Sequence, residues 1–240
     1  MKAAVHFLAL AALMATGSTF ASCDRNSDVS TESNVPVLDV KSEVTSFALG
    51  ANLTGVLPPS PPATPSEADM LTYMKEEEKL AKDVYTTLNA KWNVQIFTNI
   101  ANAEATHINA VVGLMEHLGL SNTSLSPVGE FQNPEFTNLY NQLVAQGSIS
   151  LTEAYKVGAL IEDKDISDLN ADMQKTANAS ILLVFDNLKR ASANHLRAFT
   201  KQLTVLGITY TPKFIDQTTY AQIIATPMEQ GKQYRKINGQ

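Results

Sequence analysis

The stretch "NIANAEATHINAVV", residues 99–112, combines a helical repeat of apolar residues with two side chains that can bind metals. Glu104 and His107 are three residues apart and fall on the same side of the expected helix as Ile100 and Val111. At this spacing the two side chains are separated by about 60° around the helix axis, so both can reach one point. Carboxylate oxygens and imidazole nitrogens are ligands that suit iron, manganese or zinc. The stretch therefore indicates a metal-binding position inside a helical core.

The other apolar helical stretches carry similar residues on their apolar sides. They are Glu78 in "KEEEKLAKDVY", Glu162 and Asp165 in "IEDKDI", and His195 in "ASANHLRAF", which follows Ser192 at the same three-residue spacing. Burying several ionised carboxylates in an apolar core is costly unless cations or hydrogen bonds neutralise them. Two divalent ions would balance the four carboxylates. The pattern predicts a metal site formed by Glu78, Glu104, His107, Glu162, Asp165 and His195.

A metal-free interpretation of the same residues stays open. The acidic run at residues 76–78 is also typical of a solvated face for at least two of its three members, and Asp165 could cap a helix that restarts at "DISDL". The inward polar residues would then form a hydrogen-bonded network in which Ser192 and Asn194 supply further partners. Such a network must be nearly fully satisfied to be tolerated. This alternative predicts a binding or structural module.

The elements that must position these side chains are helices. The apolar repeat predicts four long ones, at about residues 67–90, 94–118, 150–170 and 178–206. Ser66, followed by Glu67 and Asp69, marks the start of the first helix. A loop and a short helix at about 134–145 lengthen the connection between the second and third. Because strand-like alternation is nearly absent, we expect an all-α fold, an antiparallel four-helix bundle with one longer crossover containing a short extra helix.

The first residues predict export. Residues 1–22 carry an early lysine and an apolar run that is too short to span a bilayer as a mature helix, as in a secretory signal. Cys23 follows directly at "FASC", an order that resembles the lipobox of bacterial lipoproteins, in which that cysteine is acylated. The departure is Phe20, where such boxes more often carry an aliphatic residue. Ordinary cleavage that leaves a free thiol is the alternative. We expect an exported, membrane-anchored protein of the bacterial cell envelope.

The sequence then divides into a tether, a domain and a tail. Residues 23–65 are polar and later Pro-rich, as expected of a tether. Within them, "SFALGANLTGVL", residues 46–57, is apolar enough to lean on the domain as an extended piece. The helical domain is expected at 66–230, where the chain beyond the fourth helix wraps the outside and forms a short helix near 216–225. Residues 231–240 form a polar tail.

Composition limits the partners. The 240 residues carry a net charge of −6 with a pI near 5.2, which argues against a nucleic-acid-binding surface. A single cysteine provides no disulfide framework, so the fold depends on its core. Metal ions and, through the lipid anchor, a membrane are the expected partners. A homodimer stays open, and the sequence does not indicate a redox partner.

The motifs together resemble a known family. "KEEEKLAKDVY" resembles the Glu-x-x-Ala-x-x-x-Tyr pattern of ferritin-like and rubrerythrin-like proteins, and "NIANAEATH" resembles their second-helix Glu-x-x-His. "IEDKDI" resembles their third-helix acid pair, and "ASANHLRAF" lies at the position of their fourth-helix Glu-x-x-His. The combination resembles the uncharacterised bacterial ferritin-like family called domain of unknown function 2202, over roughly residues 66–230.

The resemblance implies a di-iron centre, with manganese or zinc as other metals, that reacts with oxygen or peroxide or handles iron. Glu78 would be a terminal ligand, Glu104 and Glu162 bridging ligands, and His107 and His195 nitrogen ligands. Tyr85 would lie beside the site, where it could donate an electron or a hydrogen bond. The departure is Ser192, which stands where ferritins carry a fourth-helix Glu, so Asp165 would have to replace that carboxylate. Without such a replacement the centre would hold one ion or be vestigial.

Overall fold

The computed structural model describes residues 57–121 and 127–229, and these residues form helices and connecting segments without a strand. The helices are α1 (Pro65–Trp92), α2 (Gln95–His117), α3 (Pro134–Gly147), α4 (Leu151–Met173), α5 (Ala179–Val205) and α6 (Gln217–Ala225). The all-α fold predicted from the sequence is confirmed, and each helix lies close to its expected range. The expected signal at 1–22, Cys23, residues 24–56 and the polar tail at 231–240 lie outside the described residues. None of the helices in the described ranges is long and apolar enough to cross a membrane.

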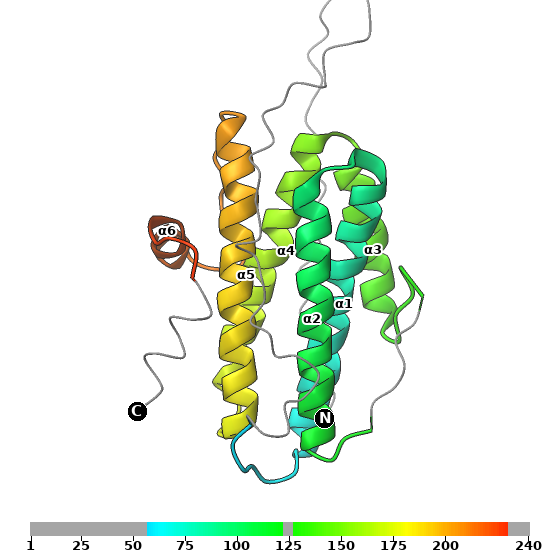
Figure 1. Ribbon diagram of the computed structural model, residues 1–240, viewed down its shortest axis with the longest axis vertical. Coiled ribbons are helices and arrows are strands. Elements are labelled where there is room, and N and C mark those ends of the chain that lie inside the picture. Colours follow the sequence, from blue (N-terminus) through cyan, green and yellow to red (C-terminus); the bar gives the residue numbers. More distant parts are fainter. Residues whose placement is uncertain (1–56, 122–126, 230–240) are drawn as a thin grey trace, which may run out of the picture. The chain divides into compact units, whose positions relative to one another are not determined.

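Four long helices, α1, α2, α4 and α5, lie side by side, and α3 packs outside them (Figure 1). α1 packs along α2, and α4 packs along α5, whereas α2 and α5 contact each other much less closely. α3 contacts both α1 and α4. The colours of Figure 1 show that α2 and α4 run in the same direction. The chain must therefore return along the molecule between them, and the segment containing α3 makes this return.

The first helix begins two residues earlier than predicted, because Thr64 and not Ser66 caps it. The Thr64 hydroxyl accepts a hydrogen bond from the Glu67 backbone N–H at 3.3 Å, and the Glu67 carboxylate accepts one from the Thr64 backbone N–H at 2.8 Å. Pro65 occupies the first helical position, where its missing N–H has no cost. This reciprocal capping satisfies two donors that would otherwise lack partners.

The buried apolar side chains form two clusters along the helices. One contains Phe97, Tyr155 and Phe199, and the other contains Met74, Leu114 and Phe185. On α1, Glu78 lies between residues of the two clusters, and on α2 Glu104 and His107 do so. These three side chains therefore lie between two apolar regions that keep water away from them.

The three acidic residues at 76–78 of α1 are buried, which rules out the alternative that at least two of them form a solvated face. Glu76 is 6% and Glu77 is 4% exposed. The Glu76 carboxylate accepts backbone hydrogen bonds from Gln132 at 2.6 Å and Asn133 at 3.1 Å, so it holds the connection that leads into α3. Glu77 pairs with Lys164 of α4 at 3.1 Å. The sequence could not show this burial, because the covering residues lie more than fifty positions away.

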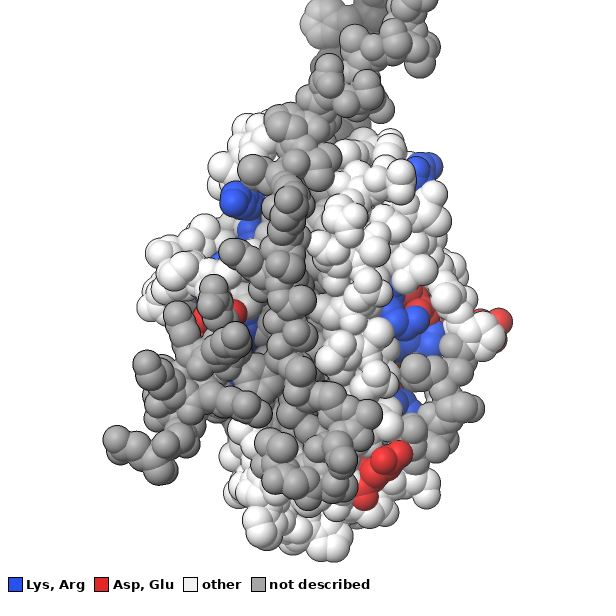
Figure 2. Space-filling model, viewed as in Figure 1, with Lys and Arg blue, Asp and Glu red and all other residues white. Residues whose placement is uncertain are grey.

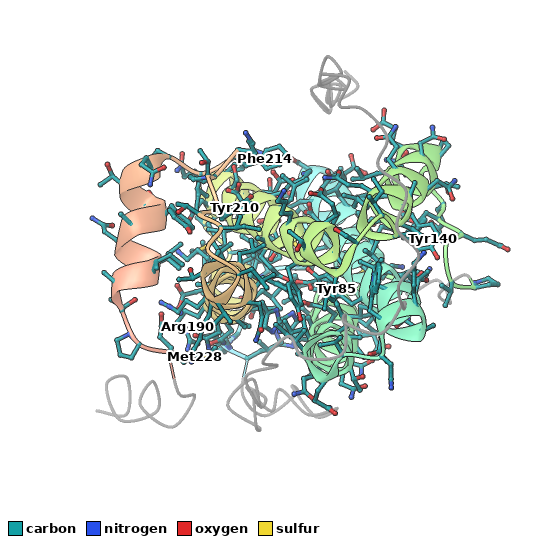
Figure 3. The ribbon with its side chains drawn as sticks, turned by 90° about the horizontal axis from the view of Figure 1, so that it is seen from above. Tyr85, Tyr140, Arg190, Tyr210, Phe214 and Met228 are labelled. Carbon is teal, nitrogen blue, oxygen red and sulfur yellow. The ribbon has the colours of Figure 1, made fainter. Side chains whose placement is uncertain are left out.

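A second buried acid fixes the C-terminal part of the chain. The Asp163 carboxylate of α4 is fully buried and accepts hydrogen bonds from the Tyr210 hydroxyl at 2.9 Å and from the backbone N–H groups of Lys213 and Ile215 at 2.5 and 2.9 Å. In Figure 3, Tyr210 and Phe214 lie near each other at the same side of the molecule. One carboxylate thus holds the segment that connects α5 to α6.

Replacing Asp163 should therefore destabilise the fold strongly. In Asp163→Ala, several buried donors lose their acceptor, so we expect the free energy of unfolding to fall by about 2–4 kcal/mol. The matched control is Asp186→Ala on α5, whose half-exposed carboxylate makes only long surface ion pairs and should cost less than about 1 kcal/mol. Urea unfolding followed by circular dichroism measures both. Equal losses in the two variants would contradict the role assigned to Asp163.

Candidate metal centre

Five buried side chains from the four long helices meet at the level between the two apolar clusters. They are Glu78 of α1, Glu104 and His107 of α2, Glu162 of α4 and His195 of α5. The amphipathic pattern of each helix turns these positions inward together with their apolar neighbours. Four of the five residues are at most 2% exposed, and His107 is 8% exposed. Each long helix therefore contributes at least one polar side chain to the core.

Their side-chain atoms form two groups that share Glu104. In the first group, Nδ1 of His107 lies 2.6 Å from Oε2 of Glu104 and 3.1 Å from Oε2 of Glu78. In the second, Nδ1 of His195 lies 2.9 Å from Oε1 of Glu104 and 3.4 Å from Oε2 of Glu162. Within each group one potential ligand atom per residue lies within 4.8 Å of the others. Glu104 directs one oxygen to each group, so its carboxylate is placed to bridge two ions.

The hydrogen bonds within the cluster are incomplete. Oε1 of Glu104 and Nδ1 of His195 are 2.9 Å apart and form an ion pair when the imidazole is protonated, but their geometry is not that of a hydrogen bond. One oxygen of Glu78 and one of Asp165 are also buried without a partner. Buried polar atoms without partners cost free energy, and native proteins contain few of them. A cation bound between these atoms would satisfy them, so the side chains present fit a metal site.

Burial and neighbouring charges shift the pKa values in the cluster. Burial raises the pKa of Glu78 to about 8, although His107 beside it acts in the opposite direction. Burial alone would lower the pKa of His195, but Glu104 and Glu162 outweigh it and raise this pKa to about 10. Burial alone would raise the pKa of Glu104, but the imidazoles of His107 and His195 favour the ionised carboxylate and bring this pKa below its usual value. In the metal-free state at neutral pH, protons therefore occupy sites that a cation would take.

Tyr85 lies next to the cluster. Its hydroxyl donates a hydrogen bond to Oε1 of Glu162 at 2.5 Å, and its ring packs against Phe97 and Phe199. Seen along the helix axes, Tyr85 lies among the long helices (Figure 3). Burial and the nearby Glu162 carboxylate raise the pKa of Tyr85 well above its usual value, so the hydroxyl keeps its proton. The tyrosine orients one carboxylate of the second group.

Asp165 lies beside the two groups but belongs to neither of them. One of its oxygens accepts a hydrogen bond from the Ser192 hydroxyl, which also contacts the Leu188 carbonyl oxygen at 3.0 Å. Burial raises the pKa of Asp165 well above its usual value, and the nearby Glu78 carboxylate adds to this rise. Ser192 thus contacts the carboxylate that would have to replace the missing fourth-helix Glu.

The prediction that Asn194 supports the cluster is wrong. Its side-chain amide donates to the Glu229 carbonyl oxygen at 3.0 Å, and its oxygen accepts from the Glu229 backbone N–H at 2.9 Å. Asn194 also accepts a hydrogen bond from Arg197 at 2.7 Å. Neighbouring helix residues differ by about 100° around the axis, so the residue before His195 points to another side. Asn194 holds the C-terminal segment instead.

A buried ion pair near the cluster was missed by the sequence reasoning. Lys164 is placed between Glu77 and Asp168 and also contacts the Tyr73 hydroxyl at 3.4 Å. Glu77 directly precedes Glu78 on α1, and Lys164 lies between Glu162 and Asp165 in the sequence of α4. The only sign of this pair in the sequence was Lys164 among the acids of "EDKDISD". Such a mixture of charges is equally typical of a solvent-exposed helix surface.

The known proteins that this chain resembles are themselves described as uncharacterised. Residues 67–227 match the family model described as "Uncharacterized protein domain (DUF2202)". The chain is 45% identical over 174 residues to "Uncharacterized protein MJ0754" of Methanocaldococcus jannaschii, a match that covers 72% of this chain and 94% of that protein. The crystal structure of hypothetical protein MJ0754 superposes with a TM-score of 0.70 at 44% identity, over 72% of this chain and 99% of the other. This chain belongs to the DUF2202 family.

Proposed function

We propose that this protein is a ferritin-like metal protein whose buried cluster binds two transition-metal ions, with iron as the main candidate and manganese or zinc as others. The observation that carries the proposal is the pair of three-residue groups that share Glu104. One ion would be held by Glu78, Glu104 and His107, and the other by Glu104, Glu162 and His195. The Glu-x-x-His spacing on α2 and the course of the four long helices support the ferritin-like assignment.

The proposed reaction class is redox chemistry with oxygen or peroxide, or the oxidation and handling of iron. Ferrous ions would supply the electrons for such a reaction. The five buried carboxylates and imidazoles would hold the ions. The two apolar clusters next to them would exclude water. Tyr85 would fix Glu162 and hold a proton next to it. The sequence has one cysteine and therefore no Cys-x-x-Cys electron relay, which favours ferroxidase or metal handling over a self-contained peroxidase.

The proposed location is the bacterial cell envelope, with Cys23 as the site of a lipid anchor. The signal-like residues 1–22 and the cysteine that follows them directly support this proposal. An anchored protein of this kind would meet metal ions and oxidants outside the cytoplasm. Radiolabelled palmitate incorporation into the wild-type chain, and its absence in Cys23→Ser, would support the anchor.

Metal content tests the proposed site directly. Residues 24–240, purified without an affinity tag from a host supplied with iron and manganese, should contain about two transition-metal ions per chain. Glu104→Ala should lose both ions, because its carboxylate serves both groups. The control is Glu116→Ala on the same helix, an exposed residue that should leave the content unchanged. Mass spectrometry of the digested protein measures the ions.

The outcomes separate the alternatives. About one ion per chain would indicate that Ser192, in place of a fourth-helix Glu, disables half of the site. A folded, metal-free chain that takes up no iron, manganese or zinc and whose melting temperature does not respond to these ions would refute the proposal. It would favour the metal-free binding or structural module, in which Glu104→Ala destabilises the fold without any dependence on metal.

Metal binding should depend on pH in a defined direction. With raised pKa values of about 8 for Glu78 and about 10 for His195, both groups carry protons at pH 7 in the metal-free state. The pKa of His107 is also raised by its carboxylate neighbours, against the effect of burial. A cation must displace these protons, so the apparent affinity should rise between pH 6 and 8, by up to about tenfold per pH unit for each proton released.

Calorimetry in buffers of different ionisation enthalpy counts the released protons. We expect at least one proton to be released for each ion bound at pH 7. The number of protons released per ion should be higher at pH 6 than at pH 7. His195→Ala should reduce the number of released protons. Binding that is independent of pH across this range would contradict the assignment of these residues as ligands.

A further inference from the structure

The described chain begins at the junction between α2 and α5. Leu57 is 8% exposed and belongs to the apolar cluster that contains Leu118 and Ile181. The Pro58 carbonyl oxygen accepts hydrogen bonds from the Ser180 hydroxyl at 2.8 Å and from the His117 ring at 3.3 Å. His117 is the last residue of α2, and Ser180 is in the first turn of α5. The described chain therefore begins at one end of the line along which these two helices meet.

This side of the domain differs from the side formed by α1 and α4. α3 packs across α1 and α4, whereas in the described ranges no other helix packs on both α2 and α5. We call the line between α2 and α5 the α2–α5 seam. Its residues are those in helical register with the Pro58 contacts, namely Ala103, Ala110 and His117 on α2 and Ser180, Ala191 and Ala198 on α5. Apart from His117, the side chains at these positions are small, and Ala103 and Ala191 are partly exposed.

The outer surface of α2 is suited to an uncharged partner. Between Gln95 and Met115 the only Asp, Glu, Lys or Arg residue is Glu104, which points into the core and is 2% exposed. Figure 2 shows the described surface over the middle of α2 without Lys, Arg, Asp or Glu. The remaining outward residues of this stretch are mostly Asn, Thr, Ala and Gly, which can hydrogen-bond an extended backbone or lie flat beneath it.

The segment just before Leu57 matches this seam in composition and in length. Residues 46–56, "SFALGANLTGV", contain no charged side chain. Eleven extended residues span about 36 Å. The 23 residues of α2 span about 35 Å. Leu57 lies beside His117, and an extended chain covers about 16 Å between residues 57 and 52. The same distance along α2 leads from His117 to Thr106, so residue 52 would lie at the level of Thr106.

The seam passes the edge of the polar cluster that is least buried. The side chain of His107 is 10% exposed, whereas those of Glu78, Glu104, Glu162 and His195 are at most 2% exposed. His107 follows Ala103 by four residues and precedes Ala110 by three, so it borders the seam on α2. A chain that lies in the seam would therefore lie over this imidazole.

We propose that residues 46–56 of this chain bind along the α2–α5 seam as an extended segment and cover the His107 edge of the cluster. The segment is favoured over a second copy of the domain because it is joined to the end of the seam, which gives it a high effective concentration there. Its apolar residues, Phe47, Leu49, Leu53 and Val56, would be removed from water. The proposal concerns the position of the segment and holds whether or not the cluster binds metal.

A disulfide between designed cysteines tests the position. In metal-free residues 23–240 carrying Cys23→Ser, the pair Asn52→Cys and Thr106→Cys should form a disulfide within one chain under mild oxidation. The control pair is Asn52→Cys and Thr86→Cys, whose second cysteine replaces an exposed residue of α1. We expect the first pair to close about tenfold faster than the control, because docking raises the local concentration of the partner thiol. Circular dichroism checks that both variants remain folded.

The same experiment can overturn the proposal. Equal rates of closure for the two pairs would show that the segment does not lie in the seam. Disulfides that form between chains, in a fraction that rises with protein concentration, would show that a second copy occupies this face instead. Neither readout involves metal, so failure here is separate from failure of the proposed metal site.

A charge variant tests the covering of His107. Leu49→Asp with Leu53→Asp should release the segment and increase the modification of His107 by diethyl pyrocarbonate several-fold, measured by peptide mass spectrometry on metal-free protein. Val37→Asp with Leu38→Asp adds the same charge outside the segment and should leave His107 unchanged. Equal modification of His107 in the wild-type chain and in both variants would contradict the covering role.

Discussion

The fold of this protein is organised around the cost of placing carboxylates and imidazoles in a helical core. Five such residues from four helices meet with almost no exposure to water. Their mutual ion pairs satisfy part of the cost, since His107 contacts Glu78 and Glu104 while His195 contacts Glu104 and Glu162. Several polar atoms remain without partners. A cation would complete the arrangement, and this is why the cluster indicates binding of metal more than a structural role.

The surrounding structure keeps the cluster of carboxylates and imidazoles in place. Apolar clusters above and below it supply the burial free energy that isolated charges cannot provide. Further buried acids act on the backbone: Glu76 holds the connection into α3, and Asp163 holds the segment that leads to α6. These contacts fix α3 and the C-terminal segment against the long helices. Several acidic residues of the chain thus act inside the molecule.

The two sides of the helix array are not equivalent. α3 covers the side where α1 and α4 meet, whereas α2 and α5 are crossed by no further helix in the part of the chain that the structure describes. The least buried ligand candidate, His107, borders this second side. Access of small solutes to the cluster is therefore expected from the α2–α5 side, and whatever covers this side would influence the chemistry of the site.

The sequence by itself determined the helices and most of the cluster. Apolar repeats place the helices, and they place Glu78, Glu104, His107, Glu162 and His195 on inward faces, because a helix fixes which residues share a side. Tyr85 and Ser192 were also expected near the site, and their hydroxyls contact Glu162 and Asp165. Asn194 was not predicted correctly, because a neighbour in sequence points about 100° away on a helix.

Tertiary structure alone decided which acids are buried and how they are used. Glu76, Glu77 and Asp163 have local sequence patterns of surface residues, yet their partners come from segments more than fifty positions away. Glu104 belongs to both groups, whereas Asp165 accepts a hydrogen bond from Ser192 and belongs to neither group. Distances between atoms on different helices depend on how the helices pack, and no repeat within a single helix carries that information.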